Sequence, residues 1–130
     1  MQVLNVNLMV GALAGGNYPV TVSYTAQFSA VERFLAQNGL VFTEEVSLGG
    51  VDPGAVAILA TLGNPANIPI PAGPGQIQVA RNIMGQVPQA VLEEDPNNPP
   101  HDIIARIRVT PTPPGLPLGD TGRSNIEQVP

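Results

Sequence analysis

The segment from Tyr18 to Phe28 alternates between apolar and polar residues, and this alternation limits the fold more than any other feature of the chain. Successive side chains of a β-strand point to opposite faces of a sheet, so a period of two predicts a strand with one buried face. We expect the apolar members to face a core: Val20, Val22, Tyr24, Ala26 and Phe28. A chain built on such a strand is predicted to form packed β layers.

Other segments support the same interpretation. Residues 2–10 alternate and are expected to pair with 18–28 as a hairpin, with four residues facing the core: Leu4, Val6, Leu8 and Val10. Residues 76–83 and 101–109 also alternate, and 40–48 is predicted as a further strand. The proline-rich segment 64–75 is predicted to be a loop, and 85–100 an irregular acidic segment.

The apolar run 55–62 has two interpretations. It is apolar on all sides and contains β-branched residues, which favours a buried strand. The alternative is a second helix over 53–62, which would begin after Asp52 and end at Gly63, and would make the fold α+β. We prefer the strand.

A single short helix is predicted over about 30–38. Ser29 and Glu32 form a capping-box pattern, and Gly39 supplies a left-handed stop. Because Val31, Phe34 and Leu35 fall on one helical face, we expect that face to lie on the sheet.

The last part of the chain, 110–130, is rich in proline and is predicted to be an extended arm outside a β-rich domain of residues 1–109. The expected fold is therefore mainly β, an antiparallel β-sandwich or open barrel of about six strands with one short helix and an extended C-terminal arm. We expect the arm to contact a partner through Pro113, Pro114, Leu116, Leu118, Ile126 and Val129.

Composition argues against catalysis. The 130 residues include no Cys, no Lys and one His, against 15 Pro and 14 Gly, so nucleophiles, general bases and soft metal ligands are nearly lacking. We expect no catalytic residue, no cofactor and no enzyme activity, and a small-molecule ligand is not expected. An enzyme using His101 and the acid cluster is the least favoured hypothesis; His101 is interpreted as a loop-packing or exposed residue.

An acidic cluster of Glu93, Glu94, Asp95 and Asp102 is a weak candidate for a calcium site. Its spacing does not match an EF-hand loop, so a solvated acidic loop is preferred. Glu44 and Glu45 are consecutive in a predicted strand and therefore face opposite ways, which excludes them as a catalytic pair.

Charge excludes several partners. The net charge of −5 and five scattered Arg residues argue against nucleic acid and against an anionic membrane surface. The longest apolar run is too short for a membrane span, and 1–16 lacks the positive start of a signal peptide, so the compartment stays unknown. Arg106 and Arg108 share one predicted strand face with Asp102. We expect these residues either to pair across strands with acids such as Glu44 or to contact a neighbouring subunit.

Charged residues make up only 12% of the chain, about half the usual share, which favours a surface covered by neighbours. In size and composition the chain resembles cysteine-free, proline-rich β proteins that cement shells or filaments, such as phage capsid decoration proteins, although no motif carries this analogy. Our leading hypothesis is a non-enzymatic structural subunit of a shell, virion or filament, bound to copies of itself or another structural protein through sheet edges and the arm. The alternative is a module that binds carbohydrate or another cell-surface ligand, for which an exposed Tyr18 would be the sign.

Overall fold

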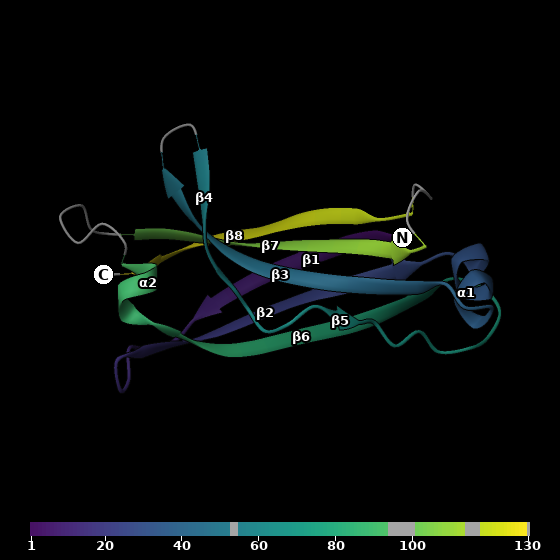
Figure 1. Ribbon diagram of the computed structural model, residues 1–130, viewed down its shortest axis with the longest axis horizontal. Helices are drawn as coiled ribbons and strands as arrows, with labels where there is room; N and C mark the ends of the chain where they lie inside the picture. The colour runs from purple at the N-terminus through teal and green to yellow at the C-terminus, as the bar shows by residue number, and fades with distance from the viewer. Residues whose placement is uncertain (53–54, 94–100, 114–117, 130) are drawn as a thin grey trace.

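The computed structural model describes residues 1–52, 55–93, 101–113 and 118–129. Within these ranges the chain forms eight strands and two short helices (Figure 1). In chain order they are β1 (Gln2–Val10), β2 (Asn17–Phe28), α1 (Ala30–Gln37), β3 (Val41–Asp52), β4 (Ala55–Thr61), β5 (Ala66–Asn67), β6 (Ile77–Pro88), α2 (Gln89–Leu92), β7 (His101–Thr112) and β8 (Asp120–Val129).

The strands form two antiparallel sheets that pack as a β-sandwich. The first sheet has the order β1-β2-β6, and the second has the order β4-β3-β7-β8, with β5 added to the same edge of β3 as β4. The expected mainly-β sandwich is therefore confirmed. The alternating face of β2 is buried as predicted, and Phe28 meets Phe42 of β3 edge to face, with ring centroids 5.0 Å apart. This contact joins the two sheets in the core.

Side chains, rather than a ladder of backbone bonds, link β1 to β8 where the two sheets meet. The backbone N–H of Val3 donates to Asp120 Oδ2 at 2.8 Å. Asn125 accepts from the N–H of Leu8 at 2.8 Å and donates to its carbonyl at 3.2 Å. A Cβ at Gly122 would lie 2.7 Å from Cγ1 of Val3, so glycine allows the two strands to approach here. Polar groups of the edge of β1 are thereby satisfied.

Strand β1 contains an irregularity that the sequence pattern does not reveal. The register with β2 shifts between Leu4 and Asn7, and Asn5 has a φ of 54°. A bulge of this kind reverses which side chains face inward. As a result Val3 rather than Leu4 packs against the core, while Val6, Leu8 and Val10 face inward as predicted. The prediction for Leu4 is wrong for this reason.

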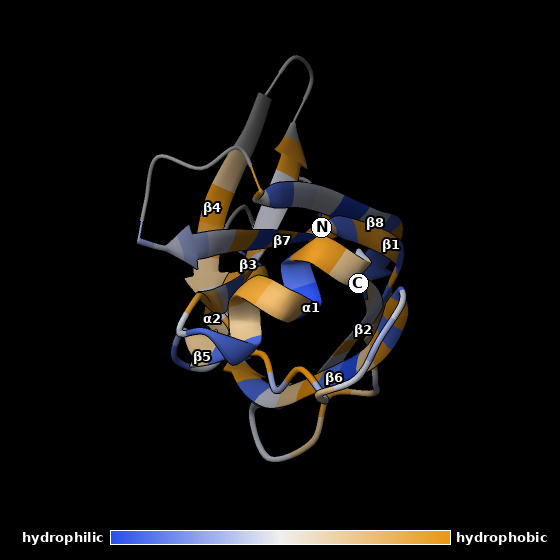
Figure 2. Cartoon of the chain, turned by 90° about the vertical axis from the view of Figure 1, so that its right-hand side faces the viewer, coloured by the Kyte–Doolittle hydropathy of each residue, from blue (hydrophilic) through white to orange (hydrophobic). Residues whose placement is uncertain are grey.

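Helix α1 begins as predicted, but two of the three apolar residues expected to face the protein are exposed. The capping box is present, with Ser29 Oγ accepting from the N–H of Glu32 at 3.2 Å. However, Glu32 and Arg33 are the buried residues, and Val31 and Phe34 are exposed. The helix lies across one end of the sandwich, where it meets loops and the first residue rather than a sheet face (Figure 2). Leu35 packs against the core as expected, so the predicted apolar stripe is wrong for Val31 and Phe34 only.

The two buried charges of α1 have specific partners. Glu32 pairs with the amino group of Met1, which also donates to the carbonyl of Leu118 at 3.1 Å. Arg33 donates to the carbonyls of Pro71, Pro74 and Gly75 at 2.8 to 3.2 Å. These bonds hold the proline-rich segment before β6 against the helix. The predicted loop over 64–75 is confirmed except for the two residues of β5.

Three segments differ from one or more of the sequence predictions: 55–61, 85–92 and 120–129. Ala55–Thr61 is a strand, so the helix alternative over 53–62 is wrong. Strand β6 continues to Pro88 and is followed by α2, where we expected irregular chain from residue 85. Residues 120–129 form β8 and pair with β7, so the extended arm is wrong for this stretch. Residues 120–129 contain no proline. The inward positions of β8 include Gly122 and Ser124, and the hydroxyl of Ser124 accepts from the N–H of Ala105 at 2.8 Å.

Candidate functional site

Strands β3 and β4 form a hairpin that rises out of the second sheet and away from the body of the molecule (Figures 1 and 2). Its bend coincides with a register shift between Leu48 and Gly49, next to a second glycine, Gly50. A bulge with adjacent glycines lets a strand bend sharply, because no Cβ restricts the backbone there. The local sequence therefore accounts for the projection of the hairpin.

The outer edge of β4 has neither charge nor proline to protect it against pairing. Among the described strands, β4 is hydrogen-bonded to β3 alone. Edge strands are normally protected by charge, proline or a covering segment. The β4 sequence, AVAILAT, contains neither a charged residue nor a proline, and the side chain of Ile58 is 67% exposed. The hairpin thus presents apolar side chains and free backbone groups to the solvent.

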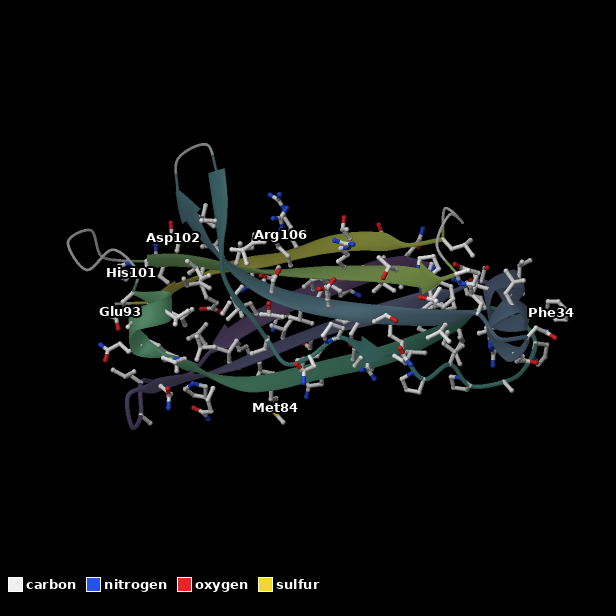
Figure 3. All side chains as sticks on the ribbon, in the orientation of Figure 1. Phe34, Met84, Glu93, His101, Asp102 and Arg106 are labelled. Carbon is white, nitrogen blue, oxygen red and sulfur yellow. The ribbon has the colours of Figure 1, made fainter. Side chains whose placement is uncertain are left out.

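A hollow of about 540 Å³ lies between the hairpin and the outer face of the second sheet. We call it the arginine groove. Arg106 points outward from the sheet beside the hairpin (Figure 3). The side chains that line the groove come from four strands: Glu45 and Ser47 of β3, Ile58 and Thr61 of β4, Arg106 and Arg108 of β7, and Thr121 and Arg123 of β8.

Strand register brings like charges together in this groove. Arg106 stands directly opposite Arg123, and Arg108 lies two residues further along the same face of β7. Like charges in opposite positions destabilise a sheet. Glu45 is opposite Arg108, yet the ion pairs in the described part of the chain are Met1–Glu32 and Arg81–Glu44. The three guanidinium groups therefore carry positive charge that no described carboxylate neutralises by contact.

The remaining two arginines are used inside the protein. Arg33 is bound to backbone carbonyls, as described above, and Arg81 of β6 pairs with Glu44 of β3. Because the chain has no Lys, every arginine available to a partner lines the arginine groove. The sequence pattern correctly predicted that Arg106 and Arg108 share one strand face. It did not predict that Arg123 joins them, because residues 110–130 were expected to form an extended arm.

Glu44 is the buried member of a polar cluster in the core. Arg81 Nε donates to Glu44 Oε1 at 2.7 Å, and the Tyr24 hydroxyl lies 3.4 Å from the same oxygen. Burial, together with the negative charge of Glu44, raises the pKa of Tyr24 well above its usual value. The carboxylate is enclosed by these partners and by the core. The expected pairing of Glu44 with Arg106 or Arg108 of β7 is wrong, because Glu44 faces the other sheet, where it binds Arg81. Glu45 is exposed, so the two glutamates do face opposite ways.

The acidic candidates for a metal site are held by other bonds where the structure describes them. Glu93 accepts from the Tyr18 hydroxyl at 3.1 Å, and Asp102 accepts from Gln128 at 3.1 Å. Glu94 and Asp95 lie outside the described residues. His101 is buried beside Asp102 at this end of the molecule (Figure 3). Within the described ranges, no three His, Asp or Glu side chains are grouped to hold a metal ion.

The residues expected to anchor an arm do not form one surface. Leu118 and Val129 pack against the protein's own core, whereas Ile126 and Pro113 are exposed. The other two candidates, Pro114 and Leu116, lie outside the described residues. Val129 is therefore covered by the protein itself, and Leu118 is only partly exposed.

Tyr18, the aromatic residue proposed for a carbohydrate platform, is buried. Burial and its bond to Glu93 raise the pKa of its hydroxyl. Phe34 is exposed instead, although the sequence pattern placed it in the core. The sign that would favour a carbohydrate-binding module is thus not found at Tyr18.

No protein-family model, curated protein or solved structure matches this chain. The two helices in the described ranges are too short to cross a membrane.

Proposed function

We propose that this chain is a non-enzymatic structural subunit that assembles with copies of itself into a shell, filament or similar particle. The projecting β3–β4 hairpin is the contact element. The observation that carries the proposal is the unprotected apolar edge of β4. An exposed edge strand offers a row of backbone donors and acceptors to a second chain, and apolar side chains on it add contact area.

The opposite edge of the second sheet supports the same function. The rest of the described second sheet is closed by side chains that bond β8 to β1, which leaves the hairpin as its open end. The open edge of β4 supports the expected contact through sheet edges. The structure gives no support to contact through an extended arm over 120–129, because these residues form β8.

Light scattering on the purified chain and two lysine variants tests this proposal. Ile58→Lys places a charge on the hairpin. Met84→Lys is the matched control, since Met84 is similarly exposed, at 72% against 67% for Ile58, and lies on β6 of the other sheet (Figure 3). We expect the wild-type chain and Met84→Lys to be oligomers and Ile58→Lys to be a monomer. Circular dichroism must show the same fold in all three.

Two outcomes would overturn the proposal. A wild-type chain that is monomeric at every accessible concentration does not assemble with itself. Oligomers of equal mass in all three proteins would show that the hairpin is not the contact element.

A further inference from the structure

The arginine groove is a concentration of positive charge on an acidic molecule. The chain carries a net charge of −5, and all three of its available arginines line this groove. Arg106 and Arg123 are held opposite each other across β7 and β8. This arrangement lowers the stability of the isolated sheet, and an anionic group bound between the guanidinium forks would offset that loss.

The protein's own surface offers a complementary partner. Glu93 and Asp102 lie at the end of the molecule formed by α2, the start of β7 and the end of β8, which we call the acidic end (Figure 3). Gln128 lies beside both residues, because it shares a hollow with Glu93 and donates to Asp102 at 3.1 Å. Each carboxylate accepts a hydrogen bond from a neutral side chain, and neither is in an ion pair with a described residue. The two negative charges are therefore not compensated by a described cation and can attract one from outside.

We propose that the arginine groove binds the acidic end of a second copy of this chain. The inference rests on the proposed function, because it specifies how neighbouring subunits are oriented. Arg106 and Arg123 receive carboxylates of the neighbour, while Ile58 and Thr61 of the hairpin form the wall beside them. The planar guanidinium fork matches a carboxylate and binds it through two parallel hydrogen bonds.

This contact joins two different surfaces, so a pair of subunits keeps one free groove on one subunit and one free acidic end on the other. Heterologous contacts of this kind form rings when the rotation closes and open filaments when it does not. The contact also depends on charge, so salt must weaken it. The Debye length, over which charges in solution attract each other, falls from about 10 Å at 0.1 M to about 3 Å at 1 M ionic strength.

Sedimentation velocity of the full chain tests the proposal. We expect the apparent dissociation constant to rise about tenfold or more between low and high salt, and again in Arg106→Gln/Arg123→Gln at low salt. Glu45→Gln is the opposite test, since among the described residues Glu45 is the only carboxylate that lines the groove. This variant should associate more tightly.

Charge reversal identifies the partner surface. Arg106→Glu/Arg123→Glu and Asp102→Arg should each fail to self-associate. An equal mixture should associate, because one variant brings an intact acidic end and the other an intact groove. A mixture that stays monomeric, or a wild-type mass that is insensitive to salt, would overturn the proposal.

The two proposals fail in different ways. Ile58→Lys adds a positive charge to the groove, so loss of assembly in that variant cannot come from weakened charge attraction. If Ile58→Lys is monomeric while the arginine variants assemble normally, the hairpin contact stands and the groove contact is refuted. If calorimetry shows that inorganic phosphate binds through Arg106 and Arg123 while sedimentation is unchanged, the groove holds a free anion and the second-copy assignment is refuted.

Discussion

Arg81 of β6 and Glu44 of β3 form a two-point contact between the two sheets, with Arg81 Nε 2.7 Å from Oε1 and 3.1 Å from Oε2 of Glu44. The side chain of Glu44 is almost completely buried, and that of Arg81 is partly exposed. Such a pair adds little to stability when intact, but loss of one partner leaves a buried charge without compensation.

Arg81→Met should therefore lower the free energy of unfolding by about 3 kcal/mol. Adding Glu44→Met should restore much of this loss, because the buried charge is then removed as well. Denaturant unfolding followed by circular dichroism measures both effects, and Arg108→Met, at an exposed position, is the control with little effect. A double variant that is less stable than Arg81→Met would contradict this account.

Tyr24 and Tyr18 predict how stability depends on alkaline pH. The pKa of each hydroxyl is raised above the usual value of 10.0 in the folded protein, first by burial and then by Glu44 or Glu93. Above pH 10 the unfolded chain releases these protons while the folded protein retains them, so stability should be constant below pH 10 and fall as the pH rises further.

Denaturant midpoints measured from pH 8 to pH 11 check this dependence. Tyr24→Phe should flatten the curve more than Tyr18→Phe, because Tyr24 contacts a buried carboxylate, that of Glu44. If the midpoint of the wild-type protein does not fall above pH 10, the raised pKa values are refuted.

Gly122→Ala should destabilise the link between β1 and β8. The new Cβ would lie 2.7 Å from Val3 Cγ1 and 3.0 Å from Val6 Cγ2, and valine side chains have little freedom to move away. Overpacking of this kind lowers the free energy of unfolding by about 1–3 kcal/mol. Thermal or denaturant unfolding measures the change, with Thr121→Ala, an exposed neighbour, as the control.

A compensating substitution makes this test specific. Val3→Ala alone removes packing, but in Gly122→Ala it also makes room for the new methyl group. The double variant should thus lose less stability than the two single losses added together. Simple additivity would show that Val3 and Gly122 are not in contact.

Ser29→Ala should lower the free energy of unfolding by about 1 kcal/mol, because it removes the acceptor for the N–H of Glu32. Ser29→Thr keeps a hydroxyl and should remain close to the wild-type value. If both variants lose the same free energy of unfolding, the loss does not come from the capping hydroxyl, because Ser29→Thr keeps it.

The alternation of β2 and β7 was sufficient to predict the mainly-β fold, because both strands bury one face. The bulge at Asn5 could not be predicted, since it arises from how β1 fits β2 and β8 and leaves no mark in the apolar pattern. Strand β8 was missed for a related reason. Its inward side includes Gly122 and Ser124, which fit against β1 and β7 without an apolar face.

The candidate site was predictable only in part. Alternation placed Arg106 and Arg108 on one face, but Arg123 joins them only through the pairing of β7 with β8. Helix α1 shows the opposite failure: Glu32 and Arg33 are buried by partners distant in sequence, which hydropathy does not record. In both cases, hydrogen bonds or ion pairs between residues distant in the sequence set the position of the side chains.

The bonds of Asn125 to Leu8 join strands that are 117 residues apart in the sequence. Closing a loop of this length opposes folding entropically, and contacts of such long range slow the search for the native state. During synthesis, β1 and β2 emerge from the ribosome long before β8 does, so the edge of β1 waits unpaired until the last strand arrives. A nascent chain that stops short of Asn125 therefore presents that edge to other chains. Synthesis of β8, ten residues long, then sets the time at which the edge of β1 is no longer open to pairing with the wrong strand.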